Sequence, residues 1–201
     1  MLPESIIKLS KILTRIPSIG PKSAEKLAIW FSGYGIDYAK DLGNILIELY
    51  NIVGICSECG YFSNGQGKIC QYCLDTTRDE SILCLVEQNI DIINIEESKA
   101  FKGQYFVLGG VISPLEGVTI SDLPFEKLKK KIISKNIKEI IIALGATTEA
   151  DVTTMYLKEF LQEISVKITV LGRGIAVGTQ IHYTGKKSLV EAFRIRENID
   201  Q

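Results

Sequence analysis

Residues 139–163, EIIIALGATTEADVTTMYLKEFLQE, decide the fold class of this chain. The first six of these residues are apolar apart from Glu139 and include three consecutive isoleucines, which is typical of a buried β-strand. After a short connection, the pattern from Thr148 to Glu163 indicates a helix. A strand followed at once by a helix is the repeating unit of α/β folds with parallel strands.

The same alternation extends on both sides of this stretch. Further strands and one further helix are expected at 82–86, 105–108 and 167–171 (strands) and at 123–134 (helix). The sequence therefore predicts an α/β domain with a mostly parallel sheet over residues 77–171. The remaining residues, 172–201, form a C-terminal segment with a short helix expected at 186–196.

A helical region precedes this domain. Helices are expected at 5–13, from Pro21 to about Gly33, and at 38–51. Pro21 suits the first turn of a helix, because its fixed φ and its missing N–H carry no penalty there. We assign residues 1–53 to this region, so the predicted architecture is an α/β chain of several modules.

Four of the five cysteines form two C-x2-C pairs separated by ten residues: Cys56, Cys59, Cys70 and Cys73. Four thiolates suit tetrahedral Zn²⁺, since each two-residue gap lets a pair bind from one tight turn, and this interpretation is favoured over four unrelated thiols. The segment 54–76 has little apolar material for a core of its own, so zinc would supply its folding energy, typically ~10–16 kcal/mol. We predict a structural zinc finger at 54–76 and expect Cys84, in an apolar strand, to be a core residue.

The overall charge excludes a protein that attracts nucleic acid with its whole surface. The chain has 23 Lys and Arg residues against 24 Asp and Glu residues, a formal net charge of −1. Basic residues are concentrated near the N-terminus and in the run Lys127–Lys131, whose simplest interpretation is a solvated helix face. No apolar run is long enough to span a bilayer and no secretory signal pattern is present, so we expect a cytoplasmic protein without membrane association.

Residues 16–24, IPSIGPKSA, resemble a helix–hairpin–helix motif, although Ser18 stands where that motif usually has glycine. The backbone N–H groups of such a hairpin and the positive end of the following helix dipole form a site for a DNA phosphate. The candidate DNA-binding residues are Arg15, Gly20, Lys22 and Lys26. Contacts of this kind fix a protein on DNA without reading sequence. An ordinary helix pair joined by a Pro-Gly turn is the alternative, and the segment by itself favours neither interpretation.

Over nearly its whole length the chain resembles the RecR family of recombination mediators. The matching features are the order of the modules, the four cysteines, and the stretches Gly20–Ala24, Arg78-Asp79, Val86-Glu87, Tyr105 with Val107–Gly110, Ser113–Gly117, Thr148-Glu149, Gly174 with Val177-Gly178, and Tyr183. The resemblance implies a Toprim-type domain, a zinc finger, and a ring-like homo-oligomer assembled through both ends of the chain, with 172–201 as the C-terminal oligomerisation segment.

The same resemblance implies a function. It indicates a non-enzymatic role in recombinational DNA repair, on DNA with gaps or with junctions between single and double strands. It implies that the chain acts with RecO, and sometimes RecF, to help RecA load on single-stranded DNA, and that it is located in the cytoplasm at the nucleoid. Glu149 is implied to belong to a partner-binding surface.

The resemblance also shows which chemistry the chain lacks. Toprim enzymes hold Mg²⁺ with a glutamate after the first strand and an Asp-x-Asp pair after a later strand. Glu87 occupies the first position, but the pair falls on Gly145-Ala146-Thr147, and only Glu149 and Asp151 follow. Because metal-assisted phosphoryl transfer needs such hard oxygen ligands, we predict no catalytic residues. A metal-dependent Toprim enzyme acting on nucleic acid, and a zinc adaptor that binds only protein, stay open as alternatives.

Four positions depart from the family pattern. Phe106, Ala150, Val170 and Thr184–Lys186 stand where histidine, glycine, arginine and an acidic pair are usual. The last three changes lie near the Toprim face and the C-terminal segment, where they bear on the implied contacts with RecO and RecF.

Overall fold

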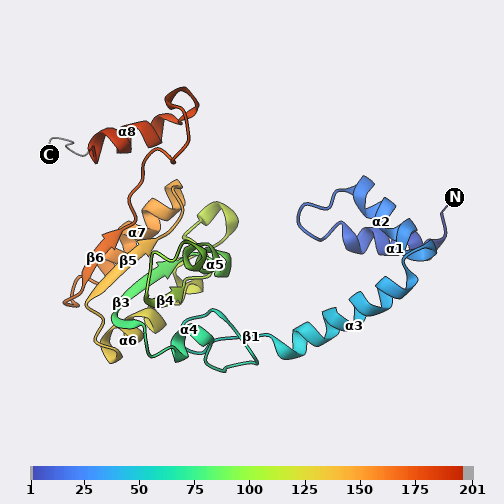
Figure 1. Ribbon diagram of the computed structural model, residues 1–201, viewed down its shortest axis with the longest axis horizontal. Coiled ribbons are helices and arrows are strands. Elements are labelled where there is room, and N and C mark those ends of the chain that lie inside the picture. Colours follow the sequence, from blue (N-terminus) through green and yellow to red (C-terminus); the bar gives the residue numbers. More distant parts are fainter. Residues whose placement is uncertain (1, 197–201) are drawn as a thin grey trace. The chain divides into compact units, whose positions relative to one another are not determined.

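The computed structural model describes residues 2–196, arranged in two compact units whose boundary falls between Gly54 and Ile55 (Figure 1). Met1 and residues 197–201, which are the ends of the expected segments 1–53 and 172–201, lie outside the described residues. Along the described chain, no helix is both long enough and apolar enough to cross a lipid bilayer.

The first unit consists of three helices, as the sequence predicts. They are α1 (Glu4–Leu13), α2 (Pro21–Gly33) and α3 (Ile36–Ile52). Ala24 and Ala28 lie one turn apart on α2 and are completely buried, and α1 packs against this helix. Small side chains at such a contact let two helix axes approach closely.

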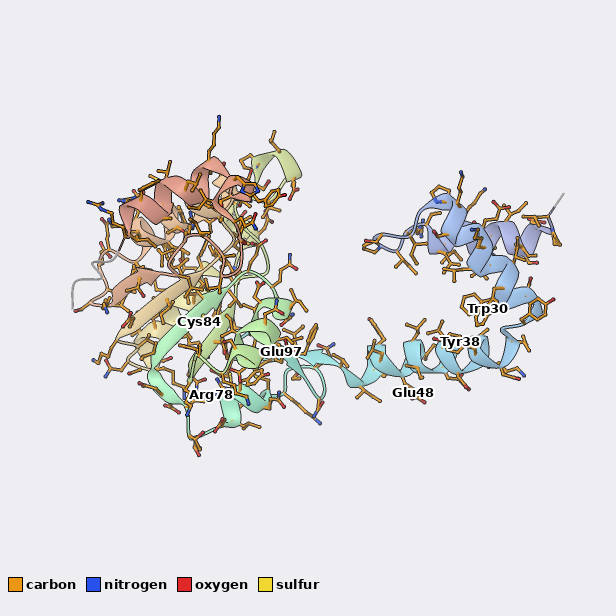
Figure 2. All side chains as sticks on the ribbon, turned by 45° about the horizontal axis from the view of Figure 1, so that its top comes forward. Trp30, Tyr38, Glu48, Arg78, Cys84 and Glu97 are labelled. Atoms are coloured by element: carbon orange, nitrogen blue, oxygen red, sulfur yellow. The ribbon has the colours of Figure 1, made fainter. Side chains whose placement is uncertain are left out.

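Gly35 forms the corner between α2 and α3. A Cβ at this position would lie 2.6 Å from the Trp30 ring, so glycine is required unless the indole moves. Trp30, Phe31 and Tyr38 form an aromatic cluster at this corner, and the rings of Trp30 and Tyr38 meet edge to face with their centroids 5.7 Å apart (Figure 2). In contrast to this corner, α3 buries none of its residues.

The segment 55–76 opens the second unit and is rich in turns. Strands β1 (Gly54–Ile55) and β2 (Phe62–Ser63) pair with one another, and a short helix, α4 (Gln71–Leu74), follows. The turn between the strands is closed by the Gly60 N–H, which donates to the Cys56 carbonyl at 3.1 Å. Gly60 has a φ of 79°, in the left-handed region that glycine adopts at little cost.

A four-stranded parallel sheet forms the centre of the second unit, with the strand order β4-β3-β5-β6. The strands are β3 (Asp79–Val86), β4 (Gly103–Val107), β5 (Glu139–Ala143) and β6 (Lys167–Val170). The helices are α5 (Asn89–Ser98), α6 (Phe125–Ser134), α7 (Thr148–Phe160) and α8 (Lys186–Arg194), with 3-10 turns at Pro114–Glu116, Ile120–Asp122 and Ile181–Tyr183. This confirms the predicted α/β class and the parallel sheet.

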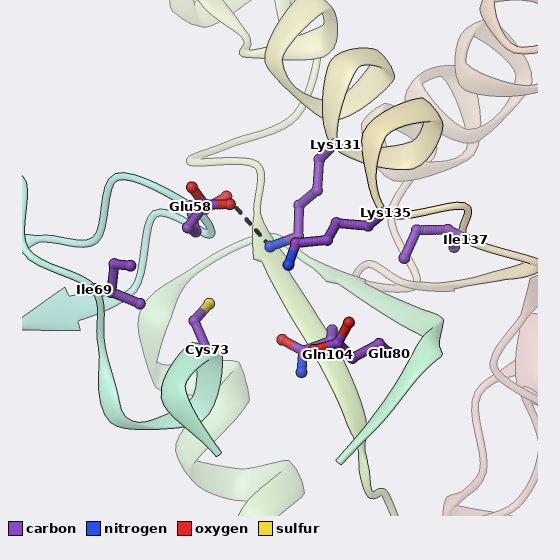
Figure 3. A pocket seen from close by; sticks show the side chains of 8 residues that line it. All are labelled: Glu58, Ile69, Cys73, Glu80, Gln104, Lys131, Lys135 and Ile137. Atoms are coloured by element: carbon purple, nitrogen blue, oxygen red, sulfur yellow. Dashed lines mark hydrogen bonds between the residues drawn. The ribbon is translucent and has the colours of Figure 1, made fainter. Parts of the chain in front are cut away.

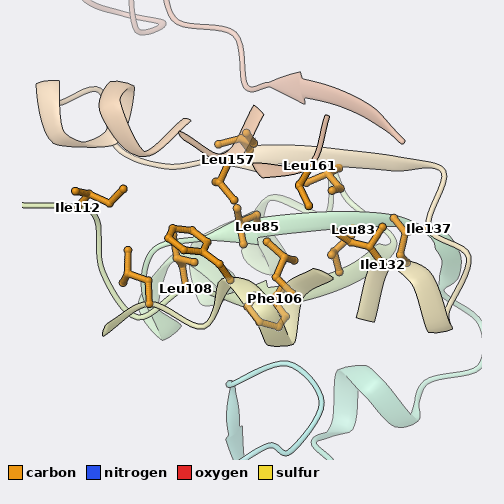
Figure 4. Close-up of a cluster of buried hydrophobic side chains, with 14 residues drawn as sticks. Leu83, Leu85, Phe106, Leu108, Ile112, Ile132, Ile137, Leu157 and Leu161 are labelled. Carbon is orange, nitrogen blue, oxygen red and sulfur yellow. The ribbon is translucent and has the colours of Figure 1, made fainter. Parts of the chain in front are cut away.

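The two faces of the sheet are covered by different material. On one face, Leu83 and Leu85 of β3 belong to a core that α6 and α7 complete (Figure 4). On the other face, the alternate residues Cys84 and Val86 pack with Ile92 of α5 and with the cysteine-rich segment 55–76. Because successive side chains of a strand point to opposite faces, β3 contributes to both cores. The cysteine-rich segment is therefore part of the second unit's core.

A few elements differ from the prediction. Helix α5 is absent from the predicted elements, because its isoleucines do not form one stripe and only Ile92 among its residues is buried. Strand β3 begins at Asp79 rather than Ile82, because the Asp79 N–H donates to the Lys102 carbonyl at 2.9 Å and extends the pairing. Helix α7 ends at Phe160 rather than Glu163.

Candidate metal centre and nucleic-acid interface

Two tight turns bring the four predicted ligand cysteines together. Cys56 and Cys59 lie in the turn between β1 and β2, whereas Cys70 is the N-cap of α4 and Cys73 lies within that helix. All four Sγ atoms lie within 4.8 Å of one another, and those of Cys59 and Cys70 are 3.5 Å apart. The remaining cysteine, Cys84, is 3% exposed in β3 and is a core residue, as predicted.

The sulfur positions fit a tetrahedral metal ion. Four thiolates at the usual zinc–sulfur distance of ~2.3 Å lie about 3.8 Å from one another, within the range seen here. Two backbone groups orient the sulfurs: the Tyr61 N–H donates to Cys59 Sγ at 3.4 Å, and the Cys70 N–H donates to Cys56 Sγ at 3.3 Å. Four protein ligands complete a tetrahedron, so the arrangement suits a structural metal rather than a catalytic one.

The pKa values of the cysteine thiols depend on one another, and a bound cation would change them. Hydrogen bonds to Cys70 and Cys73, together with burial, raise the pKa of the Cys59 thiol. The hydrogen bond from Cys59 lowers the pKa of Cys70. One sulfur thus keeps its proton so that its neighbour can lose one, which is the behaviour of a coupled pair. A divalent cation removes this restriction, because metal ligation deprotonates thiols.

The cysteine-rich segment is held on the sheet by backbone and aromatic contacts. The Val107 N–H at the end of β4 donates to the Cys59 carbonyl at 2.7 Å. Arg78, whose side chain is 9% exposed, lies 4.8 Å from the ring centre of Tyr72 and pairs with Glu96 of α5 at 2.7 Å. The Tyr105 hydroxyl donates to the same Glu96 carboxylate. Arg78 is thus the residue that joins α4, α5 and the sheet, a role that the sequence pattern does not reveal.

The hairpin between α1 and α2 carries the predicted DNA-contact residues. Gly20 is the N-cap of α2, and a Cβ built on it would meet no atom within 4 Å. Lys22 and Lys26 are exposed and lie one turn apart on α2, whereas the exposed Arg15 lies in the connection that follows α1. The first N–H groups of any helix lack partners within it, so this end of α2 offers donors beside open space. No basic side chain takes part in an ion pair among residues 2–54.

The backbone conformation of Ser18 shows how the hairpin forms with serine in place of the usual glycine. Ser18 has a φ of 68°, in the left-handed region where the motif usually places glycine. Serine adopts this region at a cost, because its Cβ approaches the following carbonyl oxygen. The hairpin therefore keeps the left-handed residue of the motif although the glycine is missing.

The carboxyl ends of β3 and β5 meet at the edge where Toprim enzymes hold their metal ions. A Cβ built on Gly145 would lie 3.8 Å from Glu87 Oε2, so the loop 145–147 faces Glu87 with side chains that carry no carboxylate. Burial raises the pKa of Glu87, and the negative charges of Asp91 and Glu116 raise it further. The edge holds a cavity of about 450 Å³ lined by Glu87, Asp91 and Gly145.

The two acids beyond this loop do not complete a metal site. Asp151 pairs with Arg173 at 2.5 Å, and the same guanidinium donates to the Gly145 carbonyl at 3.3 Å. Glu149 is half-buried in the first turn of α7, where a negative charge is favourable beside the helix N-terminus. Within residues 2–196, the four cysteines are the only group of three or more His, Cys, Asp or Glu side chains placed to hold one metal ion.

These features define a Toprim-type domain with a cysteine centre packed on its sheet, and the Toprim domain family matches residues 81–172. Three curated relatives are named recombination protein RecR. Those of Desulfatibacillum aliphaticivorans and Moorella thermoacetica are 35% identical over 194 and 198 residues, covering 96% and 98% of each chain. That of Maridesulfovibrio salexigens is 32% identical over 200 residues, 98% of each chain. The chain therefore belongs to the RecR family of recombination proteins, as the resemblance predicted.

Proposed function

We propose that this chain is a zinc-containing, non-enzymatic DNA-binding mediator of recombinational DNA repair in the cytoplasm, at the nucleoid. It acts with RecO, and in some settings RecF, to promote loading of RecA on single-stranded DNA. Membership of the RecR family supports the recombination role. The observation that supports the non-enzymatic part is the sheet edge, where Glu87 faces the loop 145–147, whose side chains carry no carboxylate.

Zinc is the metal that the cysteine centre suits best. Four thiolates in two C-x2-C pairs favour a borderline-soft ion with tetrahedral geometry, and Zn²⁺ meets both conditions. Cys56, Cys59, Cys70 and Cys73 hold it, and its task is structural. The ion fastens the two turns of segment 55–76 to each other, and the segment covers the sheet.

DNA is held by backbone contacts at the start of α2. The N–H groups beside Gly20 take a phosphate oxygen, and Lys22, Lys26 and Arg15 add positive charge around it. Such contacts are weak in a single chain with a net charge of −1. Several copies on one DNA molecule multiply them, because each further contact becomes intramolecular. Gapped DNA and junctions between single and double strands offer the geometry for this binding.

Two apolar surfaces support assembly into a ring-like homo-oligomer. Helix α3 exposes the large side chains Ile36, Tyr38, Ile45, Leu46, Ile47, Leu49, Tyr50 and Ile52. Near the other end of the chain, Val190 and Phe193 of α8 are 65% and 70% exposed. A monomer rarely leaves such areas in contact with water. One self-contact at each end of the chain is what a closed ring of identical subunits requires.

Glu149 belongs to the partner surface in this proposal. It is half-buried at the start of α7, and none of the ion pairs between described residues includes it. A carboxylate at such a position can pair with a basic side chain of RecO. The departures at Ala150, Val170 and Gly185 lie in the same part of the chain, so this contact is the one most open to change in this protein.

The deciding experiment compares binding to gapped DNA for three forms of the full chain at several salt concentrations. Lys22→Glu with Lys26→Glu should abolish the mobility shift that the unaltered chain gives at low salt. The matched control is Lys8→Glu with Lys40→Glu, which makes the same charge change away from the hairpin and should weaken binding far less.

Two results would replace the proposal with its alternatives. Mg²⁺- or Mn²⁺-dependent cleavage or synthesis of labelled DNA that Glu87→Gln abolishes would identify a Toprim enzyme. No shift for the assembled oligomer, and no effect of the lysine substitutions, would identify a zinc adaptor that binds only protein. The mass of the oligomer and its zinc content, measured on the same sample, complete the comparison.

A further inference from the structure

One lysine of α6 is buried, although its neighbours in the run Lys127–Lys131 face solvent or are half-buried. Lys131 is 8% exposed, whereas Lys127 and Lys130 are exposed as the sequence pattern predicts. Lys131 lies three residues after Leu128 and directly before Ile132. The side chains of Leu128 and Ile132 are both buried in the sheet core. Its position on the helix therefore turns it inward, towards the cysteine-rich segment.

The ammonium group of Lys131 lacks the partner that a buried charge needs. Its one hydrogen bond to a described residue goes to the Glu58 carbonyl at 3.5 Å, which is long for an N–H···O contact. Across residues 2–196, no carboxylate oxygen lies within 4.0 Å of its Nζ. A buried lysine without an anion is costly, so its surroundings must supply negative charge in some other form.

The cysteine centre borders the same cavity as Lys131 and would supply that charge with a metal bound, whereas no carboxylate oxygen of Glu58 or Glu80 lies within 4.0 Å of the ammonium nitrogen. Lys131 and Cys73 line the same cavity of about 160 Å³, together with Glu58, Glu80, Gln104 and Lys135 (Figure 3). Figure 3 shows Lys131 of α6 and Lys135, which directly follows this helix, reaching into the cavity, with the Cys73 sulfur directed towards it. Four thiolates around one divalent ion carry a net charge of −2, and that charge is delocalised over the sulfurs rather than placed on a carboxylate.

We propose that Lys131 is a positioning residue for the metal centre: its buried ammonium group compensates the charge of the metal–thiolate cluster and fastens the cysteine-rich segment to α6. The inference rests on the proposed zinc site and adds to it a residue outside the four ligands. In this arrangement α6 serves two cores. Leu128 and Ile132 pack in the sheet core, and Lys131 extends into the cavity that Cys73 also lines.

The test measures zinc affinity of the full chain by competition with a chromophoric chelator. Lys131→Met and Lys131→Gln should each weaken zinc binding by about tenfold or more, the range found for residues that support metal ligands. Lys131→Arg keeps the charge and should stay within about twofold of the unaltered chain. Glutamine retains an N–H donor for the Glu58 carbonyl, so its failure to substitute separates the charge from the hydrogen bond. Lys135→Met, in the same cavity but exposed, is the matched control and should change nothing.

Stability without the metal gives a second readout. After chelation the buried ammonium has no cluster to compensate, so Lys131→Met should melt at the same temperature as the unaltered chain or higher. With zinc bound, the same variant should lose the ion faster. Substitution by Co²⁺ reports whether the four-thiolate geometry persists in each variant, because its absorption bands depend on tetrahedral sulfur ligation.

Three outcomes decide between explanations. If the chain binds no zinc at all, the proposed zinc site fails. If it binds one zinc ion per chain but Lys131→Met retains full affinity, the zinc site stands and the role of Lys131 is refuted. If the effect of Lys131→Met disappears in a chain that also carries Glu58→Gln and Glu80→Gln, the partner of Lys131 is a carboxylate, and the inference is overturned.

Discussion

The left-handed Ser18, in the hairpin proposed to contact DNA, provides a quantitative test of the fold. Ser18 has a φ of 68°, and no hydrogen bond from its side chain is found among the described residues, so Ser18→Gly removes no such bond. The left-handed conformation costs an L-residue about 1–2 kcal/mol. Glycine avoids this cost but gives the unfolded chain more freedom, which offsets roughly 0.5–1 kcal/mol. The first unit should therefore gain about 0.5–1 kcal/mol.

The assay uses the single tryptophan of the chain, Trp30, which lies in α2 against Tyr38 and so reports on the first unit. For a unit of this size the urea m-value is about 1 kcal/mol/M, so the unfolding midpoint seen by Trp30 fluorescence should rise by roughly 0.5–1 M. Chain concentration must be equal in both samples, because self-association stabilises. Ser10→Gly in α1 is the control and should lower the midpoint, since glycine weakens a helix interior. An unchanged or lower midpoint for Ser18→Gly would refute the assignment of strain to this position.

Three further predictions follow from the sites described above. Gly20→Ala should leave the free energy of unfolding within about 0.5 kcal/mol of that of the unaltered chain, since the added Cβ meets no atom within 4 Å. The same change should weaken the DNA mobility shift, because the methyl group occupies the space of a phosphate. Equal DNA binding would exclude phosphate contact at this residue. Cys56→Ser should lose the bound zinc and lower the stability of the second unit by several kcal/mol, a fraction of the ~10–16 kcal/mol of a structural zinc site; one retained zinc ion per chain with an unchanged melting curve would contradict this. Because burial raises the pKa of Glu87, its ionised form opposes folding, so Glu87→Gln should be neutral or stabilising at pH 7; this advantage should shrink as the pH falls through the pKa of Glu87 in the folded chain and vanish below its ordinary pKa in the unfolded chain. Thermal melts of both proteins at pH 7 and at an acidic pH check this. If Mg²⁺ raises the melting temperature of the unaltered chain but not that of Glu87→Gln, Glu87 is instead a metal ligand.

Much of the architecture follows from local patterns. The apolar strand at 139–144 and the helix after it were predictable because each buries a continuous set of residues, and β5 (Glu139–Ala143) and α7 confirm them. The cysteine centre was predictable for a different reason, since two C-x2-C pairs carry their geometry in their spacing. Such features depend on neighbours in the sequence, so one chain is enough to find them.

The features that were not predictable depend on contacts between distant segments. Nothing in the run Lys127–Lys131 marks Lys131 as buried, because its burial comes from the docking of segment 55–76 beside α6. Arg78 likewise gains its role from Tyr72 and Glu96, which lie on other elements. Helix α5 was not predicted, because Ile92 is its only buried residue and its sequence shows no continuous apolar stripe.

The hydrogen bond from the Val107 N–H to the Cys59 carbonyl connects the cysteine centre directly to strand β4 of the sheet. Helix α5 and this loop cover one side of β3 and β4, so removal of the proposed zinc ion would leave Cys84 and Val86 beneath a loop that no longer keeps its shape. Oxidants or chelators that attack the sulfurs would thus loosen the central strands as well. If the proposed zinc site holds, the supply of metal also controls the integrity of the domain that carries the proposed partner surface.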